Sequence, residues 1–277
     1  MAVMISDSAW VDPRAKLADD VEIGPFCMVG PDVVLGRGTR LIGHVCLYGI
    51  TVLGDGNVVH PFSVIGGDPQ EPALRDMAFR TVIGDANIFH EGVVINRGGK
   101  ADTGETRIGS HNQVHAGVHV AHDGLIGNRI TIGNSSILGP RVAVEDHATL
   151  GPGVSVHHDV TVGQLSFIGG QSRIYHDVPP FMLVDGHPAR VRCINAVGLR
   201  KQRLTSESIQ AIHEAHRLIY RARLQPGQAM DNLKAHGHWT PEVQHLLKAV
   251  EEQNLGRHGR AREIGHPDSK AFQSVEI

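Results

Sequence analysis

The stretch IGSHNQVHAGVHVAHDGLIGNRITIG (residues 108–133) has an aliphatic residue at every sixth position, and this period decides the fold. An α-helix cannot use such a repeat, because its apolar face recurs about every 3.6 residues. A triangular coil can use it, since each hexad supplies one short strand and one turn, and three hexads close one coil. The stretch therefore predicts a parallel β-helix whose aliphatic side chains point inward.

The same period extends from this stretch toward both ends of the chain. Glycine often follows the aliphatic residue, as in Ile23-Gly24, and we expect it at corners where backbone crowding or a positive φ excludes a Cβ. The chain thus belongs to the all-β class, as a left-handed parallel β-helix of hexapeptide repeats. The inward positions are Val11, Leu17, Ile23, Val29, Leu35, Leu41, Leu47, Leu53, Val59, Ile65, Ile83, Phe89, Ile95, Ile108, Val114, Val120, Ile126, Ile132, Leu138, Val144, Leu150, Val156, Val162, Ile168 and Ile174.

The repeat stops at two prolines, Pro179 and Pro180, which remove hydrogen-bond donors from a strand ladder. Helical patterns follow at residues 196–203 and 206–223, and Thr240-Pro241 is a typical helix start. The sequence therefore predicts a hexapeptide-repeat domain over residues 1–190 and a small α-helical C-terminal domain over 191–255. The polar, patternless residues 256–277 predict a disordered tail.

Two excursions interrupt the hexads. The first is GDPQEPALRDMAFR (residues 67–80) and the second is GKADTGE (residues 99–105). Loops that leave an otherwise strict repeat add nothing to the scaffold, so they are candidate functional segments. Tolerated insertions at coil corners are the alternative explanation.

Composition limits the class of protein. Aromatic residues make up only 4%, which suits a narrow prism filled with Val, Ile and Leu, and the net charge of −3 gives no reason to expect nucleic-acid binding. The three cysteines are far apart, and neither a targeting signal nor a membrane span is recognisable, so we expect a cytoplasmic protein. A triangular prism offers equivalent faces for three-fold packing, which predicts a homotrimer.

Among 19 histidines, the run His119-Val120-Ala121-His122-Asp123 carries the strongest chemical signal. Val120 takes the inward place, so His119 points outward, and His122 falls near a corner. A neighbouring carboxylate can orient an imidazole so that its other nitrogen acts as a base near neutral pH.

Several motifs together resemble the UDP-N-acetylglucosamine O-acyltransferases, which open lipid A synthesis. The resemblance covers nearly the whole chain, first the coils and then the helices. The motifs are IGGDPQ (65–70), HVAHDGLIGN (119–128), the end of SVHH with His157, DVPP (177–180) and INAVGLRK (194–201).

The resemblance implies that His122 is the general base for the sugar 3-hydroxyl, which attacks an acyl thioester on acyl carrier protein, and that Asp123 supports it. No metal and no cofactor are implied, and the family forms trimers with sites between subunits. A glycine at position 170 implies an open slot for a longer acyl chain. The substrate-binding residues that the resemblance implies are Gln70, His119, Arg141, His157, Gly170, Asn195 and Lys201.

The chain departs from the family pattern near the base. Pro140-Arg141 stands where the family has Gly-His, whose glycine N–H is the proposed oxyanion donor, and proline has no N–H. The Arg141 guanidinium is a candidate replacement. Ala73 replaces a lysine, although Arg75 is close by. Val197 replaces an acidic residue, and Gln202 replaces one member of a basic pair whose other member is Lys201.

Other functions fit parts of the pattern. An N-acyltransferase on a UDP-amino sugar, or an acetyltransferase that uses coenzyme A, would need less oxyanion support. Zinc-dependent hydration would need three converging imidazoles, of which His115, His119 and His122 could supply some and a neighbouring subunit the others. A catalytically weakened paralogue is a further alternative. The basic residues between Arg200 and Arg223 are either a solvated helix face or a docking surface for an acidic carrier protein.

Overall fold

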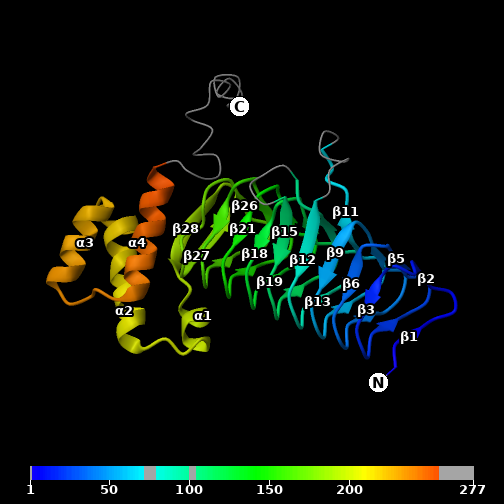
Figure 1. Ribbon diagram of the computed structural model, residues 1–277. Coiled ribbons are helices and arrows are strands. Elements are labelled where there is room, and N and C mark those ends of the chain that lie inside the picture. Colours follow the sequence, from blue (N-terminus) through cyan, green and yellow to red (C-terminus); the bar gives the residue numbers. More distant parts are fainter. Residues whose placement is uncertain (1, 72–78, 100–103, 256–277) are drawn as a thin grey trace.

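The structure, a computed structural model, describes residues 2–71, 79–99 and 104–255. Over these ranges the strands form three sheets, which we name A, B and C, and the chain visits them in that order in every coil. Figure 1 shows the coils stacked into one column, with the N-terminus at one end and the helices at the other. The predicted parallel β-helix followed by a small helical part is confirmed.

The strands pair in parallel within each sheet, except for the final hairpin of sheet A, which is antiparallel. Sheet A contains β1 (Met4–Ile5), β4 (Glu22–Ile23), β7 (Arg40–Leu41), β10 (Val58–Val59), β13 (Ile88–Phe89), β16 (Gln113–Val114), β19 (Thr131–Ile132), β22 (Thr149–Leu150), β25 (Phe167–Ile168), β27 (Met182–Gly186) and β28 (Ala189–Ile194). Sheet B contains β2 (Trp10–Val11), β5 (Met28–Val29), β8 (Cys46–Leu47), β11 (Val64–Gly67), β14 (Val94–Asn96), β17 (His119–Val120), β20 (Ile137–Leu138), β23 (Ser155–Val156) and β26 (Arg173–Ile174). Sheet C contains β3 (Lys16–Leu17), β6 (Val33–Leu35), β9 (Ile50–Leu53), β12 (Arg80–Ile83), β15 (Glu105–Ile108), β18 (Leu125–Ile126), β21 (Ala143–Val144) and β24 (Thr161–Val162).

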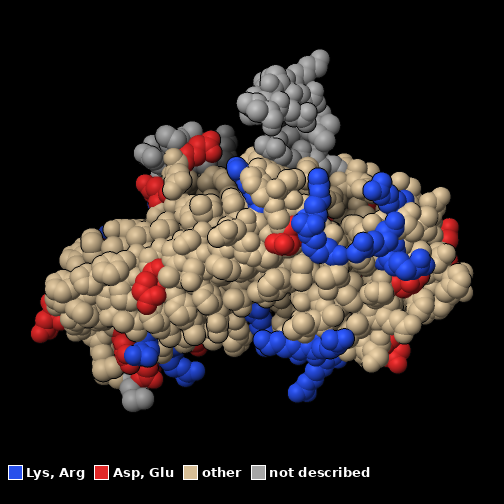
Figure 2. Space-filling view, turned by 180° about the vertical axis from the view of Figure 1, so that it is seen from behind, with Lys and Arg blue, Asp and Glu red and all other residues tan. Residues whose placement is uncertain are grey.

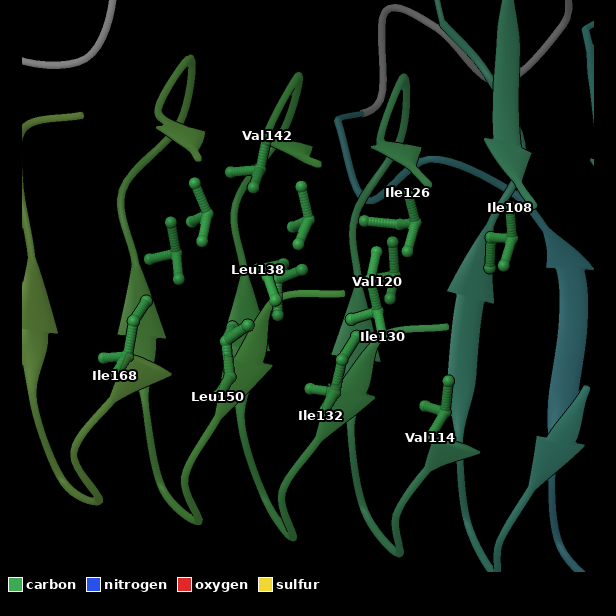
Figure 3. Packing of buried hydrophobic residues seen from close by; sticks show 14 of the residues in the cluster. Ile108, Val114, Val120, Ile126, Ile130, Ile132, Leu138, Val142, Leu150 and Ile168 are labelled. Carbon is green, nitrogen blue, oxygen red and sulfur yellow. The ribbon is translucent and has the colours of Figure 1, made fainter. Parts of the chain in front are cut away.

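The inward residues stack along the axis of the column. Ile132 pairs with Leu150, and Leu150 pairs with Ile168, so that each coil repeats the one before it. Figure 3 shows these side chains following one another inside the column, and all three are buried. Burial of such a side chain stabilises the fold by roughly 1.5–3 kcal/mol, and the repeat supplies this gain in every coil.

The glycines after the inward residues are required by close backbone approach. A Cβ on Gly24 would lie 2.1 Å from the carbonyl oxygen of Ile42 in the next coil. The left-handed turn positions are mostly held by other residue types, including Phe62, Asp123 and Arg141. Close approach of the backbone in the next coil therefore explains the glycine at position 24, whereas a positive φ does not.

The C-terminal part begins with the β27–β28 hairpin, which continues sheet A across the domain boundary expected at residue 190. The predicted helix start at Thr240-Pro241 is confirmed, because Thr240 Oγ1 accepts a hydrogen bond from the backbone N–H of Val243. None of the helices in the described ranges has the length and apolarity of a membrane span. The expected tail, 256–277, lies outside the described residues. The helices are α1 (Ala196–Lys201), α2 (Ser206–His216) with a π-helical extension η2 (Arg217–Arg221), α3 (Pro226–Ala235) and α4 (Pro241–Asn254).

We predict that Gly24→Ala destabilises the protein by about 3 kcal/mol, because the added methyl group collides with the backbone of the next coil. Gly227→Ala is the control, since nothing lies within 4 Å of a Cβ there. Urea denaturation followed by circular dichroism measures both variants. Equal midpoints for the two variants would contradict this account of the corners.

Candidate active site at the corner between sheets B and C

Both excursions leave the column at the same corner, between sheets B and C, which we call the BC corner. Residues 68–79 connect β11 to β12, and residues 97–104 connect β14 to β15 one coil later. Their bases are tied together, because Asn96 Nδ2 donates to the carbonyl oxygen of Asp68 at 2.7 Å and Arg97 pairs with the Asp68 carboxylate at 2.6 Å. His122 and Asp123 occupy this corner in the next coil, between β17 and β18.

His122 and Asp123 form a buried pair whose side chains are each 6% exposed. His122 Nδ1 donates to Asp123 Oδ2 at 2.8 Å, since a carboxylate oxygen can only accept. The second carboxylate oxygen, Oδ1, accepts from the backbone N–H of Gly99 at 2.7 Å. The Asp123 backbone N–H donates to Thr106 Oγ1 at 2.9 Å. The carboxylate is therefore fixed by the second excursion, and it orients the imidazole so that Nε2 is the ring nitrogen available to accept a proton from a substrate.

The first excursion approaches the other side of the imidazole. Glu71 Oε2 lies 4.0 Å from His122 Nε2, and the Glu71 side chain is largely exposed. Gln70, the residue that the sequence singles out in this segment, is exposed next to it. Ala73 and Arg75, which bear on the missing lysine, lie outside the described residues.

His119 lies on β17, on the outer face of sheet B just before the BC corner. Burial lowers the pKa of His119, so its ring is neutral near pH 7 and can both donate and accept a hydrogen bond. A neutral imidazole suits a residue that contacts an uncharged sugar hydroxyl.

Arg141 and His157 occupy the BC corner in the coils that follow. The Arg141 backbone N–H donates to the carbonyl oxygen of His122 at 3.1 Å, which stacks the two turns directly. Arg141 Nε and Nη2 donate to the two carboxylate oxygens of Asp159, at 2.7 and 2.9 Å. His157 is half-buried, with its ring centroid 3.9 Å from that of His158. One corner thus gathers Gln70, His122, Asp123, Arg141 and His157, with His119 on the adjoining sheet.

Three expected site residues lie elsewhere in the protomer. Gly170 follows β25 at the corner between sheets A and B, where it is exposed and a Cβ would lie 3.2 Å from the Pro152 carbonyl oxygen. Asn195 caps α1, because its Oδ1 accepts from the Gly198 N–H at 3.0 Å while its Nδ2 donates to the Leu165 carbonyl oxygen at 2.8 Å. Leu165 lies at the corner between sheets C and A, and Lys201 is exposed at the end of α1.

Sequence reasoning missed Glu71, Thr106 and Asp159. For Asp159 a signal existed, since it follows Arg141 by eighteen residues and therefore stacks on it. For Thr106 there was none, because it lies at the start of β15, outside the hexad positions that the sequence pattern identifies.

Within one protomer, the three histidines of the zinc alternative do not converge on one point. His115 lies at the corner between sheets A and B, His119 lies on sheet B, and His122 lies at the BC corner. In the ranges that the structure describes, no three His, Cys, Asp or Glu side chains are grouped so that they could hold a metal ion.

The chain is similar to known proteins along most of its length. The sequence profile of the family described as "Udp N-acetylglucosamine O-acyltransferase; Domain 2" matches residues 177–259. An acyl-[acyl-carrier-protein]–UDP-N-acetylglucosamine O-acyltransferase of Syntrophobacter fumaroxidans is 42% identical over 92% of this chain and 99% of its own. The enzyme of the same name from Saccharophagus degradans is 45% identical over 83% and 89%, respectively.

Solved structures agree with the sequence comparison. The UDP-N-acetylglucosamine acyltransferase of Bacteroides fragilis superposes with a TM-score of 0.87 at 34% identity, covering 92% of this chain and 99% of its own. The corresponding structure from Acinetobacter baumannii also gives 0.87, at 33% identity, covering 92% and 98%. A buried histidine–aspartate pair at a corner of a hexapeptide-repeat column, together with this similarity over nearly the whole length, leads to one conclusion: the chain belongs to the acyl-[acyl-carrier-protein]–UDP-N-acetylglucosamine O-acyltransferase family.

Proposed function

We propose that this protein transfers an acyl chain from acyl carrier protein to the 3-hydroxyl of UDP-N-acetylglucosamine, the first step of lipid A synthesis. The observation that carries the proposal is the buried His122–Asp123 pair, whose Nδ1–Oδ2 distance is 2.8 Å, at the corner where both excursions leave the coil. The names of the relatives supply the substrate and the acyl donor.

The chemistry needs one base and one site for negative charge. The sugar oxygen bonds to the thioester carbonyl carbon while His122 Nε2 takes the hydroxyl proton, and the carbonyl oxygen becomes an oxyanion. The C–S bond then breaks, and the leaving sulfur takes the proton from His122, so that an ester and a free thiol result. Asp123 stabilises the imidazolium between the two steps, as expected for a carboxylate that is buried against it.

A homotrimer with sites shared between protomers would unite the expected substrate-binding residues. In one protomer, Gln70, His119 and His157 lie at or beside the BC corner, whereas Gly170 and Asn195 lie at the other two corners. A neighbour's corner facing this one would bring Gly170 to the acyl chain, and Asn195 or Lys201 to the nucleotide. The exposed side chains of Phe26 (58%) and Phe62 (66%) are apolar surface that a neighbour would cover.

Acyl carrier protein is acidic, and a basic surface would speed its association. Figure 2, which views the molecule from behind, shows Lys and Arg side chains gathered on the half that carries the helices. Lys201 at the end of α1 and Arg221 at the end of η2 are exposed, while Arg217 pairs with Glu214 at 2.6 Å. We propose this helical end as the docking side for the carrier protein, and the cytoplasm as the place where the two meet.

The first prediction concerns the reaction. The purified protein should convert UDP-N-acetylglucosamine and an acyl carrier protein thioester into a product heavier by one acyl group, and the added ester should be cleaved by mild alkali. Mass spectrometry over a panel of thioesters and acceptors checks this. A product that forms only with coenzyme A thioesters, or an alkali-resistant amide on a UDP-amino sugar, would replace the proposal by the corresponding alternative.

The second prediction concerns the base. His122→Asn should lower kcat by roughly 10²–10⁴-fold with little change in KM, because a proton acceptor is lost and the sugar contacts remain. His111→Asn, at an exposed corner histidine, serves as the matched control and should retain wild-type turnover. Equal turnover of the two variants would remove His122 from the mechanism.

The third prediction concerns assembly. Phe62→Asp should convert a trimer into monomers, since it places a charge in an apolar interface, and aspartate tolerates the positive φ of this position (65°). Light scattering after size exclusion measures the mass. Met4→Asp, an equally apolar exposed position at the end of the column, is the control and should stay trimeric. A trimeric Phe62→Asp protein would exclude this corner from the interface.

A further inference from the structure

Oppositely charged side chains form a column at the BC corner, one from each successive coil. Asp123, Arg141 and Asp159 follow one another at intervals of eighteen residues, and all three have positive φ, from 57° to 60°. Asp123 holds His122, while Asp159 receives both Arg141 Nε and Arg141 Nη2. The Asp159 side chain is only 6% exposed, and that of Arg141 is 35% exposed.

Asp159 is itself fixed from two directions. His158 Nδ1 donates to Asp159 Oδ2 at 2.7 Å, the same oxygen that accepts from Arg141 Nη2. The Asp159 backbone N–H donates to the carbonyl oxygen of Pro140 at 3.0 Å. The carboxylate is therefore a rigid anchor, and the two-point contact fixes the plane of the guanidinium.

One coil after His122, at residues 139–141, every backbone N–H already donates a hydrogen bond. The Gly139 N–H donates to the carbonyl oxygen of Val156, Pro140 has no N–H, and the Arg141 N–H donates to the carbonyl oxygen of His122. A donor for a developing oxyanion at this turn must therefore come from a side chain. Among the described residues, Arg141 uses only Nε and Nη2 in hydrogen bonds, which leaves the N–H groups of Nη1.

We propose that the Arg141 guanidinium stabilises the thioester oxyanion, and that Asp159, braced by His158, is the positioning residue that holds it there. This inference rests on the proposed acyl transfer. As the acceptor oxygen bonds to the carbonyl carbon and His122 takes its proton, the electron pair of the C=O bond moves onto the oxygen, which Arg141 Nη1–H then contacts. When the C–S bond breaks, the pair returns and the charge disappears.

The charges around Arg141 suit this role. The Asp159 hydrogen bonds raise the pKa of Arg141 above its ordinary value, with smaller contributions from the carboxylates of Asp123 and Glu71. Arg141 is thus a permanent cation within electrostatic range of both residues that flank the base. A positive charge whose position is already fixed needs no reorganisation as the oxyanion forms.

The substituted positions all have a positive φ, which glycine and asparagine tolerate. Arg141→Gly should lower kcat by roughly 10²–10³-fold, as loss of one oxyanion donor does elsewhere. Asp159→Asn should lower kcat by about 10-fold or more with little change in KM, because the guanidinium stays but loses its anchor. The double variant should be no slower than Arg141→Gly alone, since Asp159 acts only through Arg141. Arg129→Gly, an exposed corner arginine with φ 54°, is the control and should keep full activity.

Chemical rescue separates positioning from a merely structural ion pair. Guanidinium ion added at millimolar concentration should restore part of the turnover of Arg141→Gly, and much less of the turnover of the double variant, which lacks the carboxylate that would hold the ion. Thermal melts confirm that each variant is folded. Full kcat in Arg141→Gly, or equal rescue with and without Asp159, would overturn the inference. If the wild-type protein transfers no acyl group at all, the proposed function fails instead.

Discussion

The closure of each coil after eighteen residues is the constraint on which the rest of the structure depends. Inside the column, this period stacks aliphatic side chains such as Ile132, Leu150 and Ile168 on one another. On the outside, it stacks the corner residues of successive coils in the same way. A site on this scaffold is consequently built as a column of side chains rather than as a cluster on one loop. His122–Asp123, Arg141 and Asp159 lie together because they share a corner, and only the excursions add groups from outside the repeat.

This constraint also explains which features the sequence predicts. The inward places of the six-residue period all carry aliphatic or aromatic side chains, so the hexads reveal the sheets directly. The His119–Asp123 run is recognisable because its members are adjacent. Corner positions carry no such restriction, and the Arg141–Asp159 pair is visible only once the register is known. Helix α3 was not predicted, because only Ala229 and Leu233 of its ten residues are buried and the apolar pattern is too short. Asn195 was expected from the sequence to bind substrate, and the structure shows that it also has a structural role, because it caps helix α1.

The corners of a prism are convex, so a corner by itself does not enclose a large substrate. The first excursion brings Glu71 to within 4.0 Å of His122 Nε2, and the second fixes Asp123 through Gly99, so these segments supply walls that the column lacks. In the proposed homotrimer, a neighbouring molecule would supply the remaining walls, and the expected site residues at the other two corners would then face a substrate.

The proposed mechanism uses the Arg141 side chain where a backbone N–H would otherwise serve as the oxyanion donor, and these two kinds of donor are held in place differently. A backbone N–H is positioned by the coil itself. An arginine side chain has about 2 kcal/mol of rotamer entropy to lose, and it contributes to catalysis only if that loss has occurred before the substrate arrives. The buried Asp159 carboxylate, which contacts Nε and Nη2 at once, orders Arg141 in advance. The proposed role of Arg141 therefore relies on Asp159, eighteen residues further along the chain, because the carboxylate holds the guanidinium in place.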